Sequence, residues 1–138
     1  MGSWEHFEHE ADIGVRGYGR TMAEAFGQAA LAMTAIITEP AGIKPDSQVG
    51  ISRFETDPEL LFVDWLNAVV YEMSTRRMLF SRFELHIEEG RLEAQLFGES
   101  IDRLRHEPVV EVKGATYTEL KVAQTGDGGW LAQCVVDV

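Results

Sequence analysis

Residues 56–74, "TDPELLFVDWLNAVVYEMS", predict a long helix that other parts of the chain surround. Thr56 or Asp57 can cap its start, and Pro58 suits the first turn because that position needs no amide donor. The apolar residues cover most of its circumference, namely Leu61, Phe62, Val63, Trp65, Leu66, Val69 and Val70. A narrow polar stripe remains, formed by Asp64, Asn67, Tyr71 and Ser74. A helix with this pattern packs on most of its sides.

The segments next to this helix carry equally clear local signals. Residues 20–40 predict a second helix, in which Thr21 and Glu24 form a capping box and Pro40 marks the end. Residues 48–55 alternate between apolar and polar side chains, as a half-buried strand does. Residues 78–89 and 91–99 predict two strands of a hairpin, joined through Glu89 and Gly90.

Strands are also expected at both ends of the chain. The alternation that begins in "WEHFEHE" (residues 4–10) places one set of side chains together if the chain stays extended, namely Phe7, His9, Ala11, Ile13 and Val15, with Glu8, Glu10 and Asp12 opposite. Residues 100–115 fit no period and are expected to form a loop, followed by strands at 116–125 and 130–138. The order of elements predicts one α+β domain over residues 1–138, a mostly antiparallel sheet layered with two α-helices.

Composition narrows the class of protein. With 45% hydrophobic and 25% charged residues, the chain has the composition of a globular protein rather than a disordered one. It shows neither a long apolar run nor a secretory leader, so a cytoplasmic location without membrane contact is expected. The single Cys134 lies in an apolar strand and is expected to be structural.

The charge balance indicates the kind of partner. The chain carries 12 basic and 23 acidic side chains, a net charge of −11. Proteins that bind nucleic acid directly do so mainly with lysine and arginine, which argues against such binding here. A basic protein partner or a hard metal cation suits a strongly acidic surface better.

Two aspartates could belong to a chemical site. Asp12 and Asp137 both fall on the less apolar side of their strands, and Asp137 is followed at once by the terminal residue Val138. If the two strands are neighbours, three carboxyl groups converge, a donor set that suits a hard divalent cation. The ordinary alternative is that these are solvated surface carboxylates. No GxSxG or phosphate-binding loop is present in the sequence to support nucleophilic or phosphate chemistry.

Two histidines have two interpretations each. His9 falls on the same side of an extended strand as Phe7, so packing or hydrogen bonding is favoured over metal binding. His106 lies in "RHEP" (residues 105–108), either as part of a salt-bridged loop held by Pro108 or as a functional loop residue.

Five segments, in this order, resemble the archease family over nearly the whole chain. They are "WEHFEHEADIG", "TMAEAFGQAALAM", "LLFVDWLNAVVYE", "GESIDRLRHEP" with "EVKGATYTELKV", and "GGWLAQCVVDV". The resemblance implies a cytoplasmic α+β accessory protein that is not itself an enzyme. Such proteins promote the guanylylation and repeated turnover of the RtcB-type tRNA-splicing RNA ligase, and a role in steering a tRNA methyltransferase is also attributed to them.

The resemblance also implies a site. A divalent metal ion (Ca²⁺, Mg²⁺ or Mn²⁺) is expected at Asp12, Asp137 and Val138. We expect a partner surface formed by His9, His106 and Lys113 beside it.

Two positions depart from the family pattern. Glu10 stands where threonine is usual and adds a charge near Asp12, and Thr118 stands where histidine is usual, so no role of that histidine transfers. Two other functions stay open at this point. One is a metal-dependent hydrolase or phosphotransferase with His9 or His106 as base, and the other is a general chaperone without a chemical site.

Overall fold

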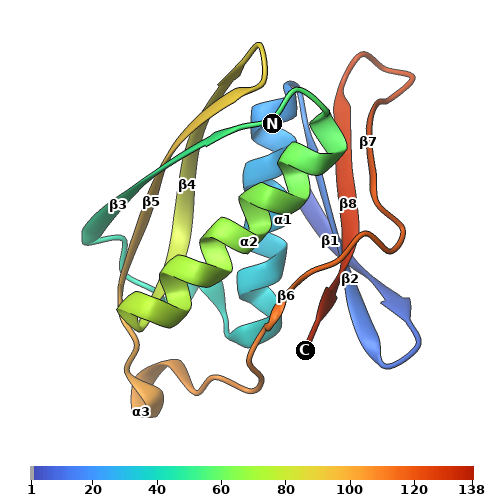
Figure 1. Cartoon of the computed structure of the whole chain (residues 1–138). Coiled ribbons are helices and arrows are strands. Elements are labelled where there is room, and N and C mark those ends of the chain that lie inside the picture. The colour runs from blue at the N-terminus through green and yellow to red at the C-terminus, as the bar shows by residue number, and fades with distance from the viewer. Residues whose placement is uncertain (1) are drawn as a thin grey trace.

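The computed structural model describes residues 2–138 and arranges them as two antiparallel sheets with helices between them (Figure 1). The five-stranded sheet has the order β1-β2-β8-β6, and β7 also pairs with β8; the three-stranded sheet has the order β3-β5-β4. The five-stranded sheet contains β1 (Ser3–His9), β2 (Asp12–Gly19), β6 (Gly114–Ala115), β7 (Lys121–Gln124) and β8 (Trp130–Asp137). The other contains β3 (Ser47–Phe54), β4 (Met78–Glu88) and β5 (Arg91–Ser100). The α+β class is confirmed.

Helix α1 (Met22–Ile37) lies between the two sheets and contacts β2 and β8 on one side and β4 on the other. The predicted cap is present, since the Thr21 side chain accepts a hydrogen bond from the Glu24 amide at 3.1 Å. The helix lies directly on β2 because Gly17 has no side chain. A Cβ atom there would be 2.1 Å from the Ala25 carbonyl oxygen, well inside contact distance.

Helix α2 (Pro58–Arg76) begins and packs as its sequence predicts. Asp57 caps it by accepting from the Glu59 and Leu60 amides. Trp65 is fully buried, and its indole N–H donates to the Phe26 carbonyl of α1 at 3.0 Å. The two helices and the inner faces of both sheets therefore share one apolar core.

The predicted hairpin of β4 and β5 is also confirmed. Its turn, Glu89 and Gly90, has φ angles of 50° and 81°. Such left-handed backbone at both central positions twists the turn in the sense that a two-residue hairpin needs. Part of the expected loop is helical, since residues Arg103–His106 form the short helix α3, and a 3₁₀ turn follows α1 at Pro40–Gly42.

The chain does not stay extended from His9 to Val15. Glu10, with φ of 52°, and Ala11 form a two-residue turn, and β1 and β2 pair so that His9 lies opposite Asp12. His9 and Phe7 therefore share a sheet face with Asp12 rather than with Ile13 and Val15. The expectation that His9 shares a face with Ile13 and Val15 was wrong. The turn could not be recognised in the sequence because it lacks the glycine or asparagine that two-residue hairpin turns usually contain.

Two further expectations need correction. The strands form two sheets rather than one, because both sheets pack on α1. The strand expected at 116–125 is shorter, since only Lys121–Gln124 forms β7. Residues 116–120 bulge out between β6 and β7, because both of these strands pair with β8. This bulge is held in place, because the Val135 amide of β8 donates to the Thr118 carbonyl at 3.0 Å.

Within residues 2–138, no helix is long and apolar enough to cross a membrane. Cys134 is buried inside β8, and this burial raises the pKa of its thiol to about 12. The thiolate is the reactive form of cysteine, so the structural role predicted for Cys134 agrees with its place in the core.

Candidate functional site

Strands β2 and β8 are neighbours, which is the condition for Asp12 and Asp137 to meet. Their antiparallel register pairs Ile13 with Val136, and one further step places Asp12 across from Asp137. Residues directly opposite each other in an antiparallel pair project their side chains on the same face. The two carboxylates therefore lie side by side at one end of the five-stranded sheet.

Strands β1 and β6 extend this row on both sides. His9 pairs with Asp12, and Gly114 pairs with Asp137, whose carbonyl accepts from the Lys113 amide at 2.7 Å. We call His9, Asp12, Asp137 and Val138 the carboxylate edge. Figure 1 shows the chain end beside β6, where this row finishes. Within residues 2–138 the side chains of Asp12 and Asp137 make no hydrogen bond or ion pair, so their oxygens are available to a ligand.

The donor chemistry of the carboxylate edge fits a hard cation. In the described part of the chain, no group of three or more His, Cys, Asp and Glu side chains is arranged to hold a metal. The two aspartates would therefore need the main-chain oxygen of Val138 and water as further ligands. Oxygen ligands of this kind, supplemented by water, are what Mg²⁺, Mn²⁺ and Ca²⁺ accept.

Asn67 of α2 holds the neighbouring strand in place. Its side-chain oxygen accepts from the Ala115 amide at 2.8 Å, and its NH₂ group lies 3.4 Å from the Ala115 carbonyl. A Cβ atom on Gly114 would be 3.0 Å from the same oxygen, so glycine allows this close approach. Asn67 thus fixes β6, and β6 in turn pairs with Asp137. Asn67 belongs to the polar stripe that the sequence shows on this helix, but its hydrogen-bond partner was not predictable.

We expect Asn67→Leu to loosen the carboxylate edge, because the Ala115 amide loses its acceptor. The free energy of unfolding should fall by about 1 kcal/mol, the usual net contribution of a hydrogen bond. Amide hydrogen exchange should accelerate at Lys113 and Ala115. Asn67→Asp keeps the acceptor and is the matched control; equal protection of these amides in Asn67→Leu and the wild type would contradict this role.

His106 is not part of the carboxylate edge. The residue is 5% exposed, and both ring nitrogens are engaged inside the loop. The Asp102 amide donates to Nδ1 at 2.8 Å, which assigns the proton of the neutral ring to Nε2, and Nε2 lies 2.9 Å from the Glu99 carboxylate. The structure therefore supports the salt-bridged loop, and neither a partner surface nor a general base at His106 fits its burial.

Glu99, which sequence analysis did not single out, is the centre of this loop. Its hydrogen-bonded ion pair with Arg105, at 2.6 Å, and its bond from the Lys44 amide, at 2.7 Å, lower the pKa of the Glu99 carboxyl from 4.5 to about 2. A carboxylate with a lowered pKa stabilises the folded state above its ordinary pKa, and that contribution is lost as the pH falls through the lowered value.

Glu99→Gln should therefore flatten the acid dependence of stability. We expect the wild type to lose stability between pH 4.5 and about 2 more steeply than the variant, and the variant to be less stable at pH 7. Denaturant unfolding at a series of pH values measures both effects. Glu111→Gln, which removes an exposed carboxylate of the same loop region, is the control and should keep the wild-type slope.

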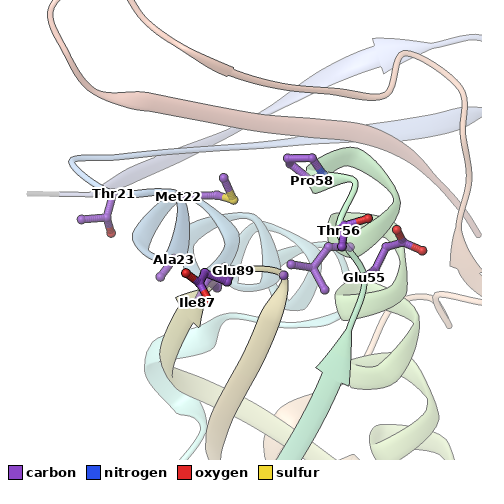
Figure 2. Close-up of a pocket in the computed structure, with 10 residues that line it drawn as sticks. Thr21, Met22, Ala23, Glu55, Thr56, Pro58, Ile87 and Glu89 are labelled. Carbon is purple, nitrogen blue, oxygen red and sulfur yellow. The ribbon is translucent and has the colours of Figure 1, made fainter.

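A shallow pocket of ≈ 220 Å³ lies at the opposite end, where α1 and α2 both begin. Figure 2 shows Thr21, Met22 and Ala23 on one side and Glu55, Thr56 and Pro58 on the other. Side chains already satisfy helix amides here, since Asp57 accepts from the Glu59 and Leu60 amides and Thr21 accepts from the Glu24 amide. With Glu55 and Glu89 in its lining, the pocket does not suit an anion.

Comparison with known proteins identifies the class. The fold matches the solution structure of Methanobacterium thermoautotrophicum protein 1598, with a TM-score of 0.87, 29% identity and 99% of each chain covered. It also matches the crystal structure of an archease from Thermotoga maritima, described as a possible chaperone, with a TM-score of 0.62 and 21% identity over 97% of this chain and 96% of that one. The second likeness concerns the fold alone.

Sequence comparison gives the family. The model of the Archease protein family (MTH1598/TM1083) matches residues 4–138. The chain is 38% identical to protein archease from Pyrococcus furiosus, over all of both chains, and 36% identical to that from Methanosarcina barkeri, over 98% of this chain and 95% of the relative. The chain therefore belongs to the archease family, as its motifs predicted.

Proposed function

We propose that this protein is a non-catalytic accessory factor of the tRNA-splicing RNA ligase and promotes its guanylylation and repeated turnover. The observation that carries the proposal is the carboxylate edge, where the register of β2 and β8, continued one step past Ile13 and Val136, places Asp12 across from Asp137 at the end of the five-stranded sheet. Membership of the archease family supports it.

The carboxylate edge supplies the chemistry in this proposal. Asp12, Asp137 and the main chain of Val138 would hold a divalent cation, which can neutralise charge that develops on a transferred phosphate. Asn67 and β6 keep Asp137 in position, and Lys113 and His9 flank the aspartates. The residues of this protein would hold and orient the cation, and the ligase would perform the covalent chemistry.

The charge of the chain supports docking on a protein rather than on RNA. A net charge of −11 repels a phosphate backbone and attracts the basic surface of an RNA-binding enzyme. We therefore expect association with the ligase to weaken steeply as salt concentration rises, since long-range attraction between surfaces is screened. Binding measured by titration at several salt concentrations tests this dependence.

The direct test is a guanylylation assay with the ligase from the same organism and labelled GTP. Catalytic amounts of this protein should raise the rate of ligase–GMP formation and allow more than one ligation per ligase molecule. No change in either quantity would overturn the proposal. Two other outcomes would replace it: altered specificity of a tRNA methyltransferase, or Mn²⁺-dependent phosphoester hydrolysis by this protein alone that Asp12→Ala abolishes.

A further inference from the structure

A second surface lies beside the carboxylate edge and has a different chemistry. It is a groove of ≈ 720 Å³ between the C-terminal half of α2 and residues 108–112, which we call the valine groove. Most of the residues that line it are apolar, among them Val70, Met73, Met78, Ile101, Val109 and Val110. Neither the packing of the fold nor the proposed metal site accounts for this groove.

The apolar side chains of the valine groove are displayed to solvent by an anchored backbone. Val109 is 75% exposed and Leu104, in the adjacent α3, is 94% exposed. Yet the Val109 amide donates to the Ile37 carbonyl, and the Ile101 amide to the Arg77 carbonyl, both at 2.9 Å. Exposed apolar groups held in a fixed groove are typical of a protein interaction site.

Two arginines with free guanidinium groups line the same groove. Arg77 and Arg103 make no ion pair within the described part of the chain, whereas their neighbours Arg76 and Arg105 are paired with Glu72 and Glu99. Among residues 2–138, Glu111 is the only acidic residue in the lining. The groove is therefore locally basic in a chain whose net charge is −11.

We propose that the valine groove docks an apolar segment that carries carboxylates and belongs to a partner protein. Apolar side chains of the segment would cover Val109 and Val110, and its carboxylates would pair with Arg77 and Arg103, because guanidinium groups bind carboxylates with two parallel hydrogen bonds. The groove leads directly into β6, since Val112 is followed by Lys113 and Gly114. One partner can therefore contact the valine groove and the carboxylate edge together.

The net charge of the whole chain and the two arginines of the valine groove predict opposite preferences for the charge of a bound peptide. A comparison of two oppositely charged peptides therefore tests the proposal. The probes are two helical peptides of about 16 residues with leucines at the same amphipathic spacing, one with glutamates and the other with lysines on the polar positions. The net charge alone favours the lysine peptide. We expect the glutamate peptide to bind more tightly and to shift the NMR signals of Val109, Val110 and Met73.

Charge variants locate the binding. Arg103→Glu should weaken binding of the glutamate peptide about tenfold, because it replaces an attraction with a repulsion at the rim. Val109→Ser, an exposed position, should also weaken it. Arg91→Glu is the matched control, since Arg91 is exposed at the opposite end of β5 and likewise makes no ion pair within residues 2–138. Asp137→Asn should leave peptide binding unchanged, so this result is independent of the proposed metal site.

Three results would overturn the proposal. The first is the absence of shifts in the groove with the glutamate peptide. The second is a lysine peptide that binds equally well or better. The third is a concentration-dependent shift of Val109 and Val110 without peptide, together with dimers in sedimentation, because a second copy of the chain would then be the occupant.

Discussion

On the proposed function, we expect the double variant Asp12→Asn/Asp137→Asn to lose at least nine tenths of the stimulation of ligase guanylylation while it stays fully folded. The two carboxylates lie directly opposite each other across β2 and β8 and have no partner within residues 2–138. Like charges in that position repel, so neutralising them should leave stability unchanged or raise it by roughly 0.2–1 kcal/mol. The variant should therefore lose stimulation of the ligase without losing stability.

Metal binding gives a second readout of the same variant. A cation that binds only the folded state raises the melting temperature of the wild type, and the rise grows with concentration. We expect this shift with Mn²⁺ or Ca²⁺ in the wild type and in the control Asp46→Asn, and none in the double variant. Full stimulation by the double variant would rule out the carboxylate mechanism, even if the accessory function itself is upheld.

Gly17→Ala is expected to cost about 3 kcal/mol or more, the upper range for overpacking a core. The added methyl group would lie 2.1 Å from the Ala25 carbonyl oxygen and 2.5 Å from the Ala29 nitrogen, which are backbone atoms of α1. No side-chain rotation can relieve a contact with helix backbone, so α1 must move away from β2. Denaturant unfolding measures the loss.

Gly126→Ala is the matched control for this prediction. A Cβ atom on Gly126 would have nothing within 4 Å, and its φ is not positive. The substitution should therefore change the free energy of unfolding by less than about 0.5 kcal/mol, as is usual at the surface. If both variants lose the same stability, close packing of α1 on β2 is not the reason for glycine at position 17.

Both long helices could be predicted because their signals are local. Thr21 and Asp57 cap α1 and α2, and apolar residues recur at helical spacing, all within short stretches of sequence. The division into two sheets could not be predicted in this way. It depends on which strands pair across long separations, and an alternating pattern does not specify which partner a strand takes.

The candidate site was predictable only in part. The alternation of side chains placed Asp12 and Asp137 on the less apolar side of their strands. Their proximity, however, depends on the pairing of β2 with β8, which no local pattern specifies. His9 was placed on the wrong face because the turn at Glu10 and Ala11 carries no usual turn residue. His106 looked like a surface residue because its burial depends on Glu99 and on how the loop folds back.

The pairing of β2 with β8 also has a consequence for the order in which the molecule assembles during synthesis. Strands β3, β4 and β5 come from residues 47–100 and can pair early, whereas β2 waits for a partner made from residues 130–137. Contacts between such distant segments form late, because a long loop must close first. The edge of β2 stays open until the ribosome has made β8. A partner that recognises the row from His9 to Asp137 would then engage only molecules whose translation has reached the last strand.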